Sequence, residues 1–79
     1  MATINRELSQ CARYIVNTAT PIKEALNEIQ AEVIRLALKE NAYNRTYTAS
    51  ALELDRATLN AQIKRLYEMG LLSDKDLNL

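Results

Sequence analysis

The sequence has little of several residue types, and each shortage excludes a kind of structure or chemistry. It contains no His, no Trp and no Phe, and one residue each of Cys, Gly and Pro among 79. Without His, and with Cys11 alone, the chain offers no zinc finger, no zinc hydrolase site, no internal disulfide and no Ser–His or Cys–His nucleophile. We therefore expect no metal site, no cofactor and no enzymatic activity.

The shortage of Gly and Pro favours helices throughout the chain. Nearly half of the residues are apolar but four Tyr are the only aromatics, so the expected core is aliphatic. At this length the chain is one domain, residues 1–79, and buries only about 60% of its unfolded surface. Dimerisation would relieve that marginal stability.

No apolar run approaches membrane-spanning length, and no charged-then-apolar leader opens the chain. We expect a cytoplasmic, nucleoid-associated protein with no membrane partner and no evident small-molecule substrate. The net charge of zero gives no support to nucleic-acid binding. Residues 42–67, however, carry four cations against two carboxylates, Glu53 and Asp55, which is a local positive surplus.

Residues 44–70 contain two short helix signals separated by a tight break. Asn44 is the predicted N-cap of a helix over 45–52, and Asp55 is the predicted N-cap of a recognition helix over about 55–69. Gly70 ends the second helix, because glycine readily takes the left-handed conformation that stops a helix. One face of this helix is a predicted buried stripe made of Leu59, Ile63 and Leu66.

Two helices joined by a few residues, the first short and the second longer, match the spacing of a helix-turn-helix. The outward face then offers Arg56, Asn60 and Lys64 as DNA base contacts, since Arg bidentate to guanine is the commonest specific contact. Short donors and helix N-termini suit phosphate. The predicted DNA backbone contacts are Asn44, Arg45, Thr46, Thr58 and Arg65. An amphipathic hairpin whose polar face simply meets water is the other interpretation.

The C-terminal half contains an ordered set of residues: Asn44, Ala49, Leu54, the run from Asp55 to Leu59, the run from Ile63 to Leu66, and Gly70 with Leu71. This set resembles the Fis-type helix-turn-helix, found in the factor for inversion stimulation and at the C-terminus of NtrC-like enhancer-binding proteins. Two departures concern the turns: Glu53 and Tyr43 stand where that family usually has Gly.

The resemblance implies a DNA-binding homodimer joined through its N-terminal helices, and DNA bending. The recognition helix has Asn60, Ala61 and Gln62 where the family often has Arg or Lys, so we expect lower affinity or a different sequence choice. The length and the initial Met1 suggest a stand-alone transcriptional regulator, such as a bacterial, phage or plasmid repressor.

Residues 4–42 read as two dimerisation helices, so the expected fold is an all-α chain of four helices. The first helix is predicted to begin at an Asn5 N-cap, after a frayed start over residues 1–3, and to have Cys11 as a core residue. The second helix is predicted to have Thr20 as N-cap and Pro21 as its first residue. A 4-3-4-3 spacing from Ile22 to Leu36 indicates a heptad-like seam, and a second apolar face lies beside it. The predicted dimer interface is Leu8, Ile15, Ile22, Leu26, Ile29 and Val33.

Another class of function fits the same residues. A helical protein–protein interaction module could keep the helix-turn-helix fold without binding DNA, and both the neutral net charge and the Ala-rich outer face favour it. After Gly70 the tail has no clear period. Ser73 and Asp76 have the spacing of a capping box, which indicates a last helical turn or a loose end.

Overall fold

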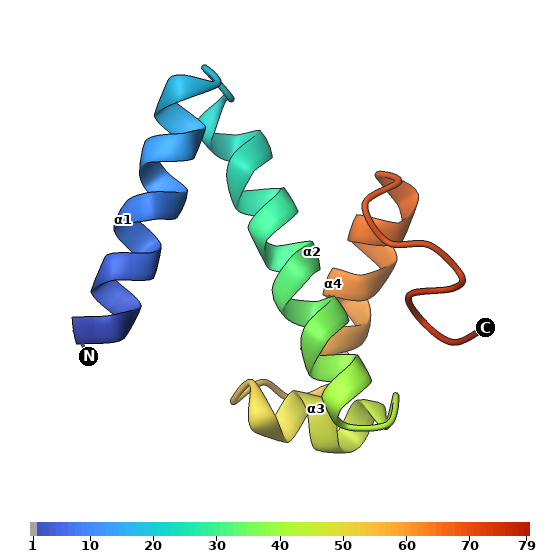
Figure 1. The fold of residues 1–79 in the computed structure, drawn as a ribbon. Coiled ribbons are helices and arrows are strands. Elements are labelled where there is room, and N and C mark those ends of the chain that lie inside the picture. Colours follow the sequence, from blue (N-terminus) through green and yellow to red (C-terminus); the bar gives the residue numbers. More distant parts are fainter. Residues whose placement is uncertain (1) are drawn as a thin grey trace.

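The computed structural model describes residues 2–79, which contain four α-helices and no strand (Figure 1). This confirms the predicted all-α, four-helix class. Within the described residues, no helix is both long enough and apolar enough to cross a membrane. The helices are α1 (Ala2–Asn17), α2 (Ile22–Glu40), α3 (Arg45–Ala51) and α4 (Arg56–Glu68).

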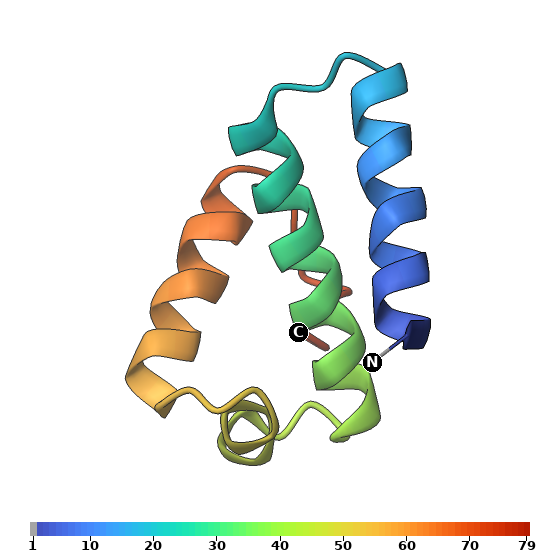
Figure 2. The ribbon, with the colours of Figure 1, turned by 90° about the vertical axis from the view of Figure 1, so that its left-hand side faces the viewer.

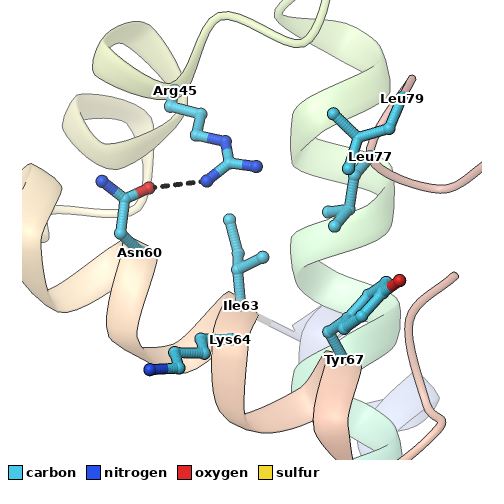
Figure 3. Close-up of a pocket in the computed structure, with 7 residues that line it drawn as sticks. All are labelled: Arg45, Asn60, Ile63, Lys64, Tyr67, Leu77 and Leu79. Atoms are coloured by element: carbon cyan, nitrogen blue, oxygen red, sulfur yellow. Dashed lines mark hydrogen bonds between the residues drawn. The ribbon is translucent and has the colours of Figure 1, made fainter. Parts of the chain in front are cut away.

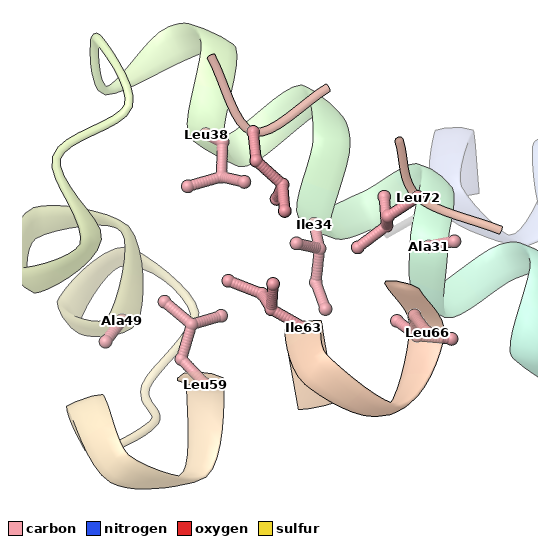
Figure 4. Close-up of a cluster of buried hydrophobic side chains, with 9 residues drawn as sticks. Ala31, Ile34, Leu38, Ala49, Leu59, Ile63, Leu66 and Leu72 are labelled. Atoms are coloured by element: carbon pink, nitrogen blue, oxygen red, sulfur yellow. The ribbon is translucent and has the colours of Figure 1, made fainter. Parts of the chain in front are cut away.

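The core lies where α2, α3 and α4 meet, and each of these three helices packs against the other two (Figure 4). The predicted stripe of α4 is buried, with Leu59 and Leu66 fully inaccessible to solvent. Burying one such leucine stabilises the fold by about 1.5–3 kcal/mol. The side chains that meet this stripe are Ala31, Ile34, Leu38, Ala49, Leu72 and Leu77.

The opposite face of α2 is open. In the heptad-like seam Ile22 is 75% exposed, Leu26 59% and Val33 45%, whereas the neighbouring Ile34 is 2% exposed. α2 therefore has two apolar faces, as the sequence predicted, and α3 and α4 cover one of them. Of the other residues predicted at the dimer interface, Ile29 and Leu8 are exposed and Ile15 is half-buried.

Helix α1 lies near α2 at the turn that joins them and diverges from it toward its own start (Figures 1 and 2), and it makes far fewer contacts with the other helices than those helices make among themselves. It begins at Ala2, so the predicted N-cap at Asn5 is wrong, because the helical turns continue through that residue. The frayed start was predicted over residues 1–3. Of these Ala2 and Thr3 are helical, and Met1 lies outside the described residues.

The junction between α1 and α2 also differs from the prediction by one residue. Pro21 has an extended backbone, with φ −57° and ψ 138°, and is itself the N-cap of a helix that begins at Ile22. Thr20 does not cap α2, because its hydroxyl is hydrogen-bonded to that of Thr18 at 2.8 Å. Helix α3 ends at Ala51, one residue earlier than predicted.

All four helices end in a turn of the same type. At the end of α4, Gly70 has φ +81°, as the sequence predicted, and the amide of Leu71 donates to the carbonyl of Leu66 at 2.9 Å. The corresponding residues after α1, α2 and α3 also have positive φ but are not glycine: Ala19, Ala42 and Glu53. A left-handed conformation costs such a residue roughly 1–2 kcal/mol.

The two positions where the resembled family has glycine both adopt this conformation, with φ 63° at Tyr43 and φ 57° at Glu53. The turn at Glu53 keeps its hydrogen bond, from the amide of Leu54 to the carbonyl of Ala49 at 2.8 Å. This bond and the half-buried Leu54 hold the turn in place without glycine.

Candidate nucleic-acid interface

Two side-chain caps fix where α3 and α4 begin, and both were predicted. The Asn44 Oδ1 atom accepts from the amide of Tyr47 at 2.9 Å, and the Asp55 Oδ1 atom accepts from the amide of Thr58 at 2.7 Å. The backbone hydrogen bond from Thr58 is the main reason that the pKa of the Asp55 carboxyl lies below its ordinary value. Each cap places an arginine in the first position of its helix.

Arg56, the first residue of α4, is exposed and contacts α3. Its Nη1 atom lies 3.4 Å from the Thr46 hydroxyl, which is also exposed. The structure thus brings together one side chain predicted to read bases and one predicted to hold phosphate. The long distance makes this a weak hydrogen bond that a ligand can replace at little cost.

One turn further along α4, Asn60 is bound to α3. The Arg45 Nη1 atom donates to the Asn60 Oδ1 atom at 2.9 Å, and both side chains are half-buried. Adenine is read by an Asn that uses its oxygen and its nitrogen together. Here the oxygen already has a partner, so base reading by Asn60 requires Arg45 to shift.

Lys64 lies one turn beyond Asn60 and is exposed. Among residues 6–79, the two ion pairs both involve Arg35 and neither involves Arg45, Arg56 or Lys64. These three cations therefore lie on α3 and one flank of α4 without a neutralising carboxylate, an arrangement that favours an anionic partner.

Arg65 is directed elsewhere. Its Nη1 atom donates to the Asn27 Oδ1 atom at 2.9 Å, and its Nη2 atom donates to the Gln30 Oε1 atom at 2.5 Å, both on α2. The side chain thus ties α4 to α2 and lies apart from Arg56, Asn60 and Lys64. In this structure Arg65 has a structural role, since its hydrogen bonds link two helices. The phosphate contact predicted for it would require giving up both bonds.

Thr58 remains exposed at the first turn of α4, and its amide is used by the Asp55 cap. Asn44 is likewise exposed but its side-chain oxygen is used as a cap, which leaves its amide nitrogen for an outside acceptor. Of the five predicted backbone contacts, Asn44, Arg45 and Thr46 lie together at the start of α3.

The tail after Gly70 is anchored, which the sequence analysis left undecided. Arg35 binds it twice, through its Nε atom to the Asp76 carboxylate at 3.2 Å and through its Nη2 atom to the Leu71 carbonyl at 3.1 Å. The Tyr67 hydroxyl donates to the Asp74 carboxylate at 2.6 Å, which raises the pKa of Tyr67.

The predicted capping-box spacing in the tail is also satisfied. The amide of Ser73 donates to the Asp76 Oδ2 atom at 3.0 Å, and this bond is the main reason that the pKa of Asp76 is lowered. Arg35 was not among the residues singled out from the sequence. The four-residue motif from Ser73 to Asp76 was the available signal that this segment is ordered.

The end of the tail lies against the flank of α4 that carries Asn60 and Lys64 (Figure 3). Leu77 is buried and Leu79 is 80% exposed, and both border a small cavity together with Asn60 and Lys64. One side of the candidate interface is therefore formed by apolar tail residues, which the sequence analysis did not anticipate.

Within the described residues no group of three or more Cys, Asp or Glu side chains is placed to hold a metal ion. Comparison of the chain with known protein families, with curated proteins and with solved structures finds no match.

Proposed function

We propose that this protein is a small sequence-specific DNA-binding transcriptional regulator that acts as a homodimer through a Fis-type helix-turn-helix. The observation that carries the proposal is one flank of α4, where the exposed Arg56 and Lys64 lie one turn to either side of the half-buried Asn60 and a positive surplus surrounds them. The short α3, the four-residue connection of residues 52–55 and the longer α4 fit a helix that enters the major groove.

In this proposal α4 enters the groove with its N-terminal end leading. Arg56 reads guanine, Asn60 offers its amide once Arg45 has moved to a phosphate, and Lys64 follows deeper along the groove. The start of α3, with Asn44, Arg45 and Thr46, meets the DNA backbone.

The open apolar face of α2 supports the homodimer. A contiguous exposed stripe of large apolar residues is unusual on a monomer and typical of an interaction surface. Two copies joined there would direct their α4 helices to successive major grooves, about 34 Å apart, on a pseudo-palindromic site that could be bent. Such a protein would be associated with the nucleoid of its cell.

The test is selection of bound duplexes from a random pool, followed by binding of the selected site at increasing salt. Arg56→Ala should weaken specific binding by about 10- to 100-fold, corresponding to roughly 1–3 kcal/mol for a bidentate base contact. Non-specific binding at low salt should remain. Arg13→Ala is the matched control, because it removes the same charge from an exposed position on α1.

One observation favours a second candidate, a helical protein–protein interaction module. The apolar residues Leu77 and Leu79 lie beside Asn60 and Lys64, and such a mixed surface suits a protein partner better than a polyanion. If wild type binds no duplex even at low salt, DNA binding is refuted and this second function is favoured.

A further inference from the structure

A cavity of about 200 Å³ lies between α3, α4 and the tail. Its apolar wall consists of Ile63 and Tyr67 from α4 and Leu77 and Leu79 from the tail, and the Arg45 guanidinium projects over it (Figure 3). Lys64 lines the rim with its alkyl stem and directs its amino group away from Ile63. The cavity thus combines one cationic group with an apolar surface.

The Arg45 guanidinium is held by one hydrogen bond, which uses only part of its donor capacity. One nitrogen, Nη1, is bonded to Asn60, and no carboxylate among residues 6–79 forms an ion pair with this side chain. A guanidinium has five N–H donors in a rigid fork that matches the two oxygens of a carboxylate. Partial burial strengthens such a pair, because water competes less for the charge.

We propose that this cavity binds a small amphiphilic carboxylate, with its carboxylate on Arg45 and its apolar body against Ile63, Tyr67 and Leu77. Pockets that hold drug-sized ligands have volumes of about 300–1,000 Å³, so the smaller cavity selects a short acyl chain or a single-ring acid. The charge of Arg45 selects an acid over an amine or an alcohol of the same length.

The site shares Arg45 and Asn60 with the candidate nucleic-acid interface, so its occupation has a regulatory consequence. A carboxylate on Arg45 neutralises a predicted phosphate contact, and its apolar body lies between the tail and the flank of α4. Ligand and duplex therefore compete, and the ligand releases the protein from DNA; this consequence rests on the proposed function.

The probe is octanoate, titrated well below its micelle concentration and followed by NMR at the Tyr67 ring and the Leu77 methyl groups. Saturable shifts at these two residues are expected with octanoate, and not with octylammonium or octanol at equal concentration. No shift, or equal shifts with octylammonium, overturns the proposal. The open stripe of α2 could also take up an alkyl chain, so the readout is restricted to these residues.

Arg45→Gln should weaken octanoate binding by about tenfold or more, the effect expected on loss of a bidentate charged pair. Arg56→Ala, which also removes one arginine but outside the cavity, should bind octanoate like wild type. Unchanged binding by Arg45→Gln overturns the site. If Arg45→Gln does not fold, the difference in binding between octanoate and octylammonium on wild type still tests whether the cavity requires a carboxylate.

The regulatory consequence has its own measurement. Octanoate should lower the affinity of wild type for its selected duplex, and octylammonium should not. If octanoate binds the cavity and leaves duplex affinity unchanged, competition is refuted and the site stands. If octanoate binds the cavity and no duplex binds the protein under any condition, the proposed function fails while the carboxylate site stands.

Discussion

The two apolar faces of α2 have opposite surroundings. On one side Ile34 is buried under α4, and on the other its neighbour Val33 is 45% exposed. The same helix thus completes a closed core with the C-terminal half and leaves an apolar stripe uncovered beside α1. The comparison shows that α3 and α4 bury one apolar face of α2, whereas the other face stays exposed, as is typical of a surface that meets a partner.

The largest difference between the two faces should appear on truncation of a leucine. Leu59→Ala removes a fully buried side chain and should lower the free energy of unfolding by about 2–5 kcal/mol, since it leaves a cavity. Leu26→Ala, at 59% exposure, should cost far less at low protein concentration. Urea denaturation measures both, and equal losses would contradict the distinction between closed and open faces.

A charge on the open face should separate the subunits of the proposed dimer. Val33→Glu should raise the dimer dissociation constant by at least about tenfold, because the interface would have to bury an unpaired carboxylate. The helix content by circular dichroism should stay the same. Sedimentation equilibrium gives the constant, and Lys23→Glu, exposed outside the seam, is the control. A wild type that is monomeric at all concentrations would refute the dimer.

The helix ends provide a smaller, reciprocal test within the closed half. Glu53→Gly should raise stability by up to about 1 kcal/mol by relieving a left-handed residue. Gly70→Ala should lower it by a similar amount, and there the effect is backbone strain alone, because an added Cβ has no atom within 4 Å. Thermal unfolding measures both variants, and a destabilised Glu53→Gly would contradict the argument.

The smallest effect expected is a pH dependence arising from the caps. The pKa values of Asp55 and Asp76 are lowered in the folded protein. Their contribution to the free energy of unfolding is therefore fully present at pH values above the pKa of an unfolded Asp, near 3.9. It is lost as the pH falls through the lowered folded values. Asp55→Asn keeps a capping side chain without the charge, so it should flatten the acid limb of stability against pH. If wild type and Asp55→Asn lost stability equally as the pH falls, the charge of the Asp55 carboxylate would make no contribution to stability.

The features predicted from the sequence are those set by neighbouring residues. The caps at Asn44 and Asp55 act on amides three residues away, and the stop at Gly70 acts within one turn. Helical spacing likewise predicted the two faces of α2. The start of α1 was missed because nothing in the sequence around Asn5 stops the helix from continuing toward Ala2.

The candidate site was less predictable, because its geometry depends on partners distant in the chain. Arg65 binds Asn27, 38 residues away, and Arg35 binds the carbonyl of Leu71, 36 residues away. No local pattern distinguishes such arginines from exposed ones that could meet DNA. The Arg45–Asn60 pair and the return of Leu77 toward α4 also follow from tertiary packing alone.

The left-handed residues at Ala19 and Ala42 have a practical consequence. Both are exposed, and both lie outside the heptad-like seam of α2, the core and the flank of α4 that carries Arg56 and Lys64. Glycine at either position therefore leaves every candidate binding surface untouched. Glycine at these two positions can therefore raise the thermal stability of the protein without altering what it recognises.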